Sequence, residues 1–135
     1  VNKKCNWGQT LIAQKGDIMY LPHEIGKIGE DLATKYLESL GYTIIERNFV
    51  ARQGEIDIIA RDKEELVFIE VKTRTNTLYG KPIDAVNDTK QKHLISTTKY
   101  YLYSNHLENE LVRLDVVEVY LREDSYRLNH IKQII

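Results

Sequence analysis

The sequence predicts a mixed α/β domain in which helices flank a β-sheet. Apolar residues recur every three or four positions over residues 23–40, several later runs are rich in β-branched residues, and the two kinds of segment alternate along the chain. The 135 residues are enough for one domain. Because the one methionine is Met19, we expect residues 1–20 to be a poorly ordered N-terminal extension and residues 21–135 a single domain.

A helix is predicted over residues 23–40, followed by Gly41 as a C-terminal cap. At 100° per residue, Glu30 falls at the edge of the apolar face, where its carboxylate can turn toward a neighbouring sheet. Asp31 falls on the polar side and is expected to be solvated.

Strands and a second helix are predicted to follow the first helix. Alternating or β-branched apolar residues predict the strands, and a rough apolar face predicts the helix. In chain order they are strands at 42–49, 56–60 and 66–73, a helix at 84–104, and strands at 113–121 and 126–135. Asp115 lies inside a β-branched strand and is expected to be a buried, hydrogen-bonded acid. Gly54 is expected to serve a tight backbone bend.

Charged residues interrupt the second and third predicted strands. If the polar turn at residues 62–65 closes an antiparallel hairpin, counting outward places Asp57 opposite Glu70, and Glu55 opposite Lys72. Lys72 then shares a face with Glu70. The apolar neighbours should point together into the core on the other face: Ile56, Ile58, Ile69 and Val71.

Two carboxylates side by side repel, so one must be protonated or a cation must lie between them. Mg²⁺ prefers oxygen ligands and often takes one or two carboxylates. Lys72 beside them can orient an attacking water or stabilise a phosphate, which is what metal-assisted phosphodiester hydrolysis requires. The alternative is a solvated strand face with a Glu55–Lys72 ion pair, and it leaves Asp57 opposite Glu70 unfavourable.

These residues resemble a known motif. Asp57 followed by Glu70-Val71-Lys72 resembles the PD-(D/E)xK nuclease superfamily, and the wider pattern resembles the small bacterial YraN-like family, similar to archaeal Holliday-junction resolvases. The segments that carry this resemblance are GKIGEDLATKYLESLGY, ERNFVARQGEIDIIARD, LVFIEVKTR and RLDVVEV.

The resemblance implies a restriction-endonuclease-like core, with a mixed central sheet flanked by helices. It implies that Glu30, Asp57, Glu70 and the carbonyl of Val71 bind Mg²⁺ or Mn²⁺, and that Lys72 is catalytic. The implied activity is a metal-dependent endonuclease acting on DNA, including branched or junction DNA, and a resolvase of this kind acts as a homodimer. The alternative is a non-catalytic nucleic-acid-binding or assembly module on the same fold.

Other features narrow these expectations. Four basic residues are candidates for contacts with a phosphate backbone: Arg47, Arg52, Arg74 and Lys90. The net charge of −1 argues against nucleic-acid binding through bulk charge alone. The four histidines fall at no metal-ligand spacing, and the nine tyrosines are interpreted as packing residues at the rim of the core. One cysteine, Cys5, excludes an intrachain disulfide, and with no apolar run near ~18 residues we expect a cytoplasmic protein.

Overall fold

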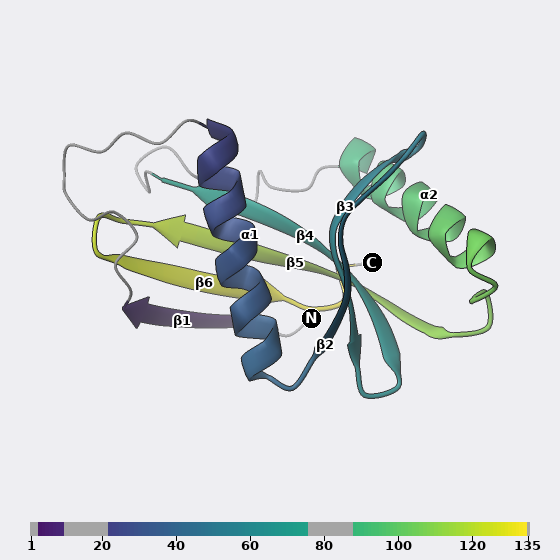
Figure 1. Ribbon diagram of the computed structural model, residues 1–135, viewed down its shortest axis with the longest axis horizontal. Helices are drawn as coiled ribbons and strands as arrows, with labels where there is room; N and C mark the ends of the chain where they lie inside the picture. The colour runs from purple at the N-terminus through teal and green to yellow at the C-terminus, as the bar shows by residue number, and fades with distance from the viewer. Residues whose placement is uncertain (1–2, 10–21, 76–87, 135) are drawn as a thin grey trace.

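The computed structural model describes residues 3–9, 22–75 and 88–134. Two helices and six strands form one α/β arrangement (Figure 1). In chain order the elements are β1 (Lys3–Gln9), α1 (Pro22–Ser39), β2 (Thr43–Ala51), β3 (Gly54–Asp62), β4 (Glu65–Arg74), α2 (Asp88–Ser104), β5 (Leu111–Leu121) and β6 (Ser125–Ile131).

The strands form one mixed sheet in the order β1-β6-β5-β4-β3-β2. β4 and β5 are parallel and are connected across α2, whereas the other neighbouring pairs are antiparallel. A parallel pair needs such a crossover connection. The predicted mixed sheet with flanking helices is therefore confirmed at this level.

One strand was not predicted. β1 pairs antiparallel with β6, which places residues 3–9 at one edge of the sheet.

The proposed division of the chain at residue 20 stays a prediction, because residues 10–21 lie outside the described part. The first four residues of the second predicted helix, 84–87, lie outside it too.

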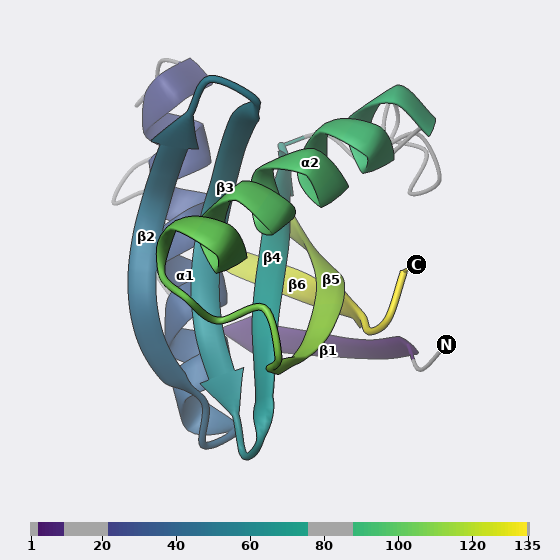
Figure 2. The same cartoon turned by 90° about the vertical axis from the view of Figure 1, so that its right-hand side faces the viewer.

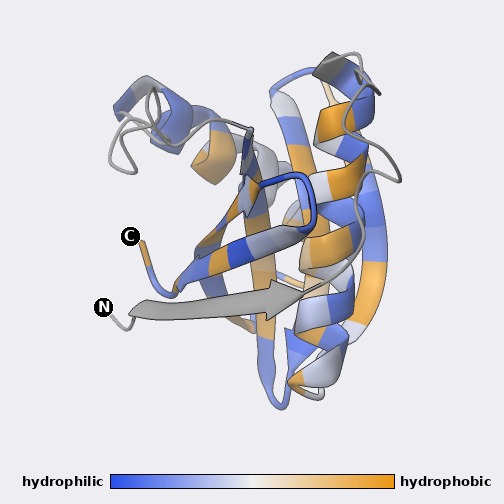
Figure 3. Ribbon diagram, turned by 90° about the vertical axis from the view of Figure 1, so that its left-hand side faces the viewer, coloured by the Kyte–Doolittle hydropathy of each residue, from blue (hydrophilic) through white to orange (hydrophobic). Residues whose placement is uncertain are grey.

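The two helices cover opposite faces of the sheet (Figure 2). Each face has its own apolar cluster: α1 packs on one that includes Leu37, Ile58 and Val117, and α2 packs on the other, which includes Ile59, Phe68 and Tyr101. In α1 hydrophobic and hydrophilic residues are interspersed, as expected for a helix with one buried face (Figure 3).

The predicted end of the first helix is confirmed. Gly41 has a positive φ of 94°, its N–H donates to the carbonyl of Glu38, and the N–H of Tyr42 donates to the carbonyl of Leu37. This pair of hydrogen bonds is the Schellman arrangement. It turns the chain directly into β2, the edge strand beside β3.

Candidate functional site

The predicted register of the β3–β4 hairpin is confirmed along most of its length. The pairs run from Asp62↔Glu65 at the turn to Ile58↔Ile69. The ladder ends one position before Asp57 and Glu70, so the predicted pairing of Glu55 with Lys72 is not formed. Glu55 pairs instead with Val50 of β2.

Asp57 occupies the point where the β3–β4 ladder ends. Its Oδ2 accepts a hydrogen bond of 2.8 Å from the backbone N–H of Val71, so a side chain replaces the backbone acceptor there. The predicted alternation breaks at the same place. Ile58, Ile69 and Val71 pack under α1 as expected, but Ile56 packs on the α2 side, so the expectation that all four share one face is wrong for Ile56.

The two predicted carboxylates interact strongly. Burial, followed by the negative charge of Glu70, raises the pKa of Asp57 to about 7, and the hydrogen bond from Val71 lowers it only in part. Lys72 lies on the same face as Glu70, with its Nζ 3.3 Å from Oε1, and both side chains are about one-fifth exposed. The structure thus brings Asp57, Glu70 and Lys72 together as predicted.

Glu30 of α1 contributes a further negative charge near Asp57. Burial raises the pKa of Glu30, while Arg47 and a hydrogen bond from Asn48 lower it. Arg47 Nη2 lies 3.7 Å from Glu30 and 2.9 Å from Asp31, so Asp31 is ion-paired and not simply solvated as expected. Arg47, predicted to contact phosphate, is engaged by these two carboxylates of the protein itself.

Two glycines allow the helices to reach the site. A Cβ at Gly29 of α1 would overlap the side chain of Thr73, so only glycine permits this approach to β4 next to Lys72. Gly54 begins β3 with a φ of 150°, and a Cβ there would lie 2.9 Å from Oγ1 of Thr97 in α2. The predicted bend at Gly54 is confirmed, and it is also a close contact with a helix.

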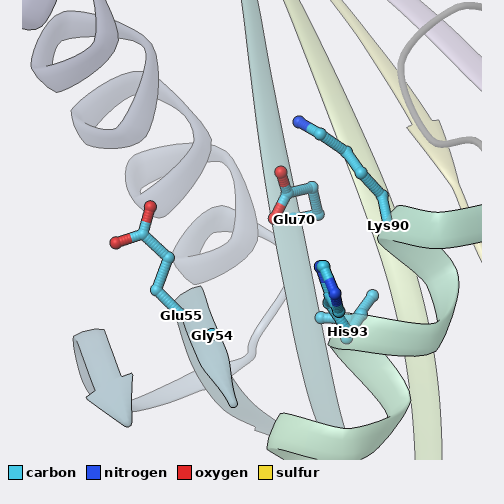
Figure 4. Close-up of a pocket in the computed structure, with 6 residues that line it drawn as sticks. Gly54, Glu55, Glu70, Lys90 and His93 are labelled. Carbon is cyan, nitrogen blue, oxygen red and sulfur yellow. The ribbon is translucent and has the colours of Figure 1, made fainter. Parts of the chain in front are cut away.

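Two cavities adjoin the acids, one near each helix. The cavity beside α2 has a volume of about 210 Å³ and is lined by Glu55, Glu70, Lys90 and His93, among others. Figure 4 shows Glu55 on β3, Glu70 on β4, and Lys90 and His93 on α2 around this space.

The cavity beside α1 has a volume of about 610 Å³. Its lining residues are His23, Gly26, Lys27, Glu30, Arg47, Asn48, Glu55 and Asp57. Glu55 borders both cavities.

Sequence reasoning missed three residues here. Glu55 was placed opposite Lys72 and given no role in the site, the histidines were given no metal-binding role, and Asn48 was not considered. The sequence contained an indication for two of them. Glu55 is two residues from Asp57, and His93 follows Lys90 by three positions, which places Lys90 and His93 on one side of a helix. The positive φ of 54° at Asn48, inside β2, has no such signal.

The remaining basic candidates differ in position. Lys90 reaches the site, and a hydrogen bond with Lys72, followed by burial, lowers its pKa. Arg52 is exposed in the β2–β3 turn, and Arg74 is half-buried at the end of β4. Whether any of them contacts nucleic acid stays a prediction.

The donor set fits a divalent cation in part. Asp57 and Glu70 supply hard oxygen ligands, and a cation would relieve their repulsion. However, no three His, Cys, Asp or Glu side chains within residues 3–9, 22–75 and 88–134 are arranged to hold a metal ion. Glu30 borders the same cavity as Asp57 but is held by Arg47.

Asp115 belongs to a separate buried network, which confirms its predicted character. Arg113 donates two hydrogen bonds to its carboxylate, of 3.0 and 3.1 Å, and His130 Nε2 lies 2.7 Å from Oδ2. The other ring nitrogen of His130 lies 3.1 Å from the hydroxyl of Tyr36 in α1. His130 is therefore a structural residue that joins β5, β6 and α1.

Residues 29–119 match the uncharacterised protein family UPF0102. The chain belongs to the UPF0102 family. It is 45% identical over 108 residues to the UPF0102 protein of Clostridioides difficile strain 630, covering 80% of this chain and 93% of that protein. It is 39% identical over 111 residues to the UPF0102 protein of Caldanaerobacter subterraneus, covering 82% of this chain and 91% of the relative.

The UPF0102 match agrees with the YraN-like resemblance of the sequence. Neither of the described helices, α1 or α2, is long and apolar enough to cross a membrane.

Proposed function

We propose that this UPF0102 protein is a metal-dependent endonuclease that hydrolyses phosphodiester bonds in DNA, including branched or junction DNA. The observation that carries the proposal is the Asp57–Glu70 pair. Burial, followed by the negative charge of Glu70, raises the pKa of Asp57 to about 7 at the point where the β3–β4 ladder ends. A resting ion pair does not need this arrangement, whereas a cation site does.

Asp57 and Glu70 would hold Mg²⁺ or Mn²⁺, with the carbonyl of Val71 as a further ligand. A bound divalent ion supplies charge stabilisation to a phosphate undergoing hydrolysis. The hydrogen bond from the N–H of Val71 to Oδ2 orients the Asp57 carboxylate for this role. We also propose the restriction-endonuclease-like core that the resemblance implies.

Lys72 is assigned to orient the attacking water or to stabilise the phosphate. Its Nζ already lies beside Glu70, and Lys90 places a second ammonium group in the same region. Basic groups next to carboxylates can contact a phosphate once the acids are neutralised by a cation. Glu30 is assigned a supporting role as a third acid, available to the site only when it leaves Arg47.

One observation favours the alternative of a non-catalytic nucleic-acid-binding module. Among the described residues, three metal ligands are not assembled together. The two functions differ in what Mn²⁺ does: an endonuclease needs it for cleavage, whereas a binding module retains its substrate without cutting it.

The test is cleavage of single-stranded, duplex, flap and four-way-junction DNA in Mn²⁺ or Mg²⁺. We expect products with the wild-type protein and a loss of at least about 100-fold in rate for Glu70→Gln and for Lys72→Met. Glu64→Gln is the matched control, because Glu64 is exposed in the β3–β4 turn. Binding of these DNAs without cleavage in either metal would replace the endonuclease with the binding module.

Symmetric cutting of a four-way junction requires two active sites, so a homodimer is part of the resolvase version of this proposal. Light scattering on the protein with and without junction DNA measures that state. A monomer that cleaves only one strand at a flap would restrict the proposal to a flap or single-strand endonuclease.

A further inference from the structure

The solvent-facing side of α2 combines basic and aromatic residues beside the candidate site. The helix carries three lysines against one acid, Asp88, which lies in its first turn. The chain as a whole has a net charge of −1. A basic helix in a slightly acidic protein is a local feature, and it is complementary to a polyanion.

Two tyrosines on α2 have large exposed surfaces. Tyr100 is 42% exposed and Tyr103 is 70% exposed, and they are three positions apart in the sequence, so they are neighbours on the helix surface. The expectation that tyrosines are packing residues therefore holds for the buried Tyr101 but is wrong for Tyr103.

Tyr100 has a rigid support. Its ring stacks on Phe49 of β2 with centroids 6.4 Å apart and an interplanar angle of 29°, and Phe49 in turn packs edge-on against Tyr101 at 5.1 Å. A ring held on one side and open on the other is suited to stacking against a further planar group.

Tyr100 lies on the same side of α2 as a residue that lines the cavity at the acids. His93 lines that cavity, and Tyr100 follows it by seven residues, which returns to the same side of the helix about 10 Å further along. Lys92 and Lys99 are exposed and also seven residues apart, so they run parallel to this line. The His93–Tyr100 line and the Lys92–Lys99 line therefore both extend along α2, away from the acids.

We propose that the α2 surface, formed by Lys92, His93, Lys99, Tyr100 and Tyr103, binds an unpaired nucleic-acid strand and directs it to the site at Glu70. This inference rests on the proposed function, because it names the substrate class of the same site. The lysines contact the phosphates, and the bases stack on Tyr100 and Tyr103. Stacking needs exposed base faces, which an intact duplex hides, so single strands and flaps are preferred over duplex.

The test measures binding without divalent metal, so it does not depend on cleavage. Fluorescence anisotropy in EDTA compares a labelled 20-nucleotide single-stranded DNA, the same sequence as RNA, and a blunt duplex. We expect tighter binding of the single strands than of the duplex. Tyr100→Ala should weaken single-strand binding roughly five-fold or more, and Tyr100→Phe should retain it, because stacking uses the ring and not the hydroxyl.

Matched controls separate this surface from general effects. Leu111→Ala removes a hydrophobic side chain that is 61% exposed on β5, and it should leave binding unchanged. Lys99→Gln should reduce the salt dependence of binding by about 0.7 in logarithmic slope, whereas Lys63→Gln, in the β3–β4 turn, should not. Tyr103→Ala provides a second aromatic test at a position too exposed to affect folding.

Several results would overturn the inference. Equal affinity for duplex and single strand with no effect of Tyr100→Ala would exclude base stacking on α2. Self-association that Tyr100→Ala abolishes would make this face a contact between two copies of the chain. Cleavage of DNA without any effect of the α2 variants would preserve the proposed endonuclease and remove only its α2 binding surface. Single-strand binding that depends on the α2 variants, without cleavage in any metal, would preserve the α2 binding surface and remove the proposed endonuclease activity.

Discussion

Replacing Asp57 by asparagine should stabilise the metal-free protein at neutral and alkaline pH. The asparagine side chain keeps an oxygen that can accept the hydrogen bond from Val71, so the local geometry is retained. The substitution removes the half-buried negative charge that interacts with Glu70. A gain in stability from altering a candidate catalytic residue is the opposite of what a structural ion pair predicts.

The magnitude follows from the pKa of Asp57. Burial and Glu70 raise it from 3.8 to about 7, and each unit corresponds to about 1.4 kcal/mol, so the ionised form costs about 4 kcal/mol above pH 7. Below pH 3.8 the carboxyl is protonated in both states and contributes nothing. Between pH 3.8 and about 7 the unfolded chain is ionised while the folded one holds its proton, so stability falls as pH rises.

The assay is urea unfolding in EDTA at several values between pH 4 and pH 9. The difference between Asp57→Asn and wild type should grow by about 1.4 kcal/mol per pH unit up to pH 7 and then stay constant. Asp124→Asn, at an exposed position between β5 and β6, is the matched control and should show no such growth. A difference between Asp57→Asn and wild type that does not vary with pH would refute the reasoning, because it would mean that Asp57 is ionised throughout at little cost.

Two further substitutions test the supports of the site and the core. Gly54→Ala should destabilise the protein by at least about 2 kcal/mol in urea unfolding, because the φ of 150° at Gly54 and its approach to Thr97 both oppose a Cβ. Gly26→Ala is the control and should stabilise the protein by about 0.5–1 kcal/mol, because Gly26 lies in α1 and a Cβ there would have no atom within 4 Å. An equal effect of the two would show that α2 does not need this contact. Arg113→Ala should cost about 3–5 kcal/mol, because it removes two hydrogen bonds to the buried Asp115 carboxylate. Arg61→Ala breaks a partly exposed ion pair with Glu110 and should cost less than about 1 kcal/mol by the same measurement. A loss below 1 kcal/mol for Arg113→Ala would mean that water replaces the guanidinium.

The sequence was sufficient for the hairpin and for the central acids. The polar turn and the period-two alternation set the β3–β4 register, and the structure follows it as far as Ile58↔Ile69. The edge position of Glu30 on α1 was likewise predictable from helical periodicity, and the structure places it beside the cavity that contains Asp57. Both results depend on local geometry that repeats along the chain.

Other features depend on contacts between distant segments. The end of the hairpin ladder at Asp57 is one such feature, since the carboxylate takes a backbone hydrogen bond there. The role of Arg47 is another, because its partners lie on α1 and the prediction considered only external phosphates. β1 has the sequence KKCNWGQ, which lacks the alternation that identifies a half-buried strand, so only its pairing with β6 reveals it.

The most direct test is to measure Mn²⁺ binding to the metal-free protein at pH 8. Electron paramagnetic resonance of the free ion reports how much Mn²⁺ is bound. We expect the wild-type protein to bind Mn²⁺ and Asp57→Asn and Glu70→Gln each to weaken binding by at least about ten-fold, because each removes one of two carboxylate ligands. Asp124→Asn should bind as the wild type does. Equal binding by all four proteins, or no binding by any, would contradict the assignment of Asp57 and Glu70 as a cation site.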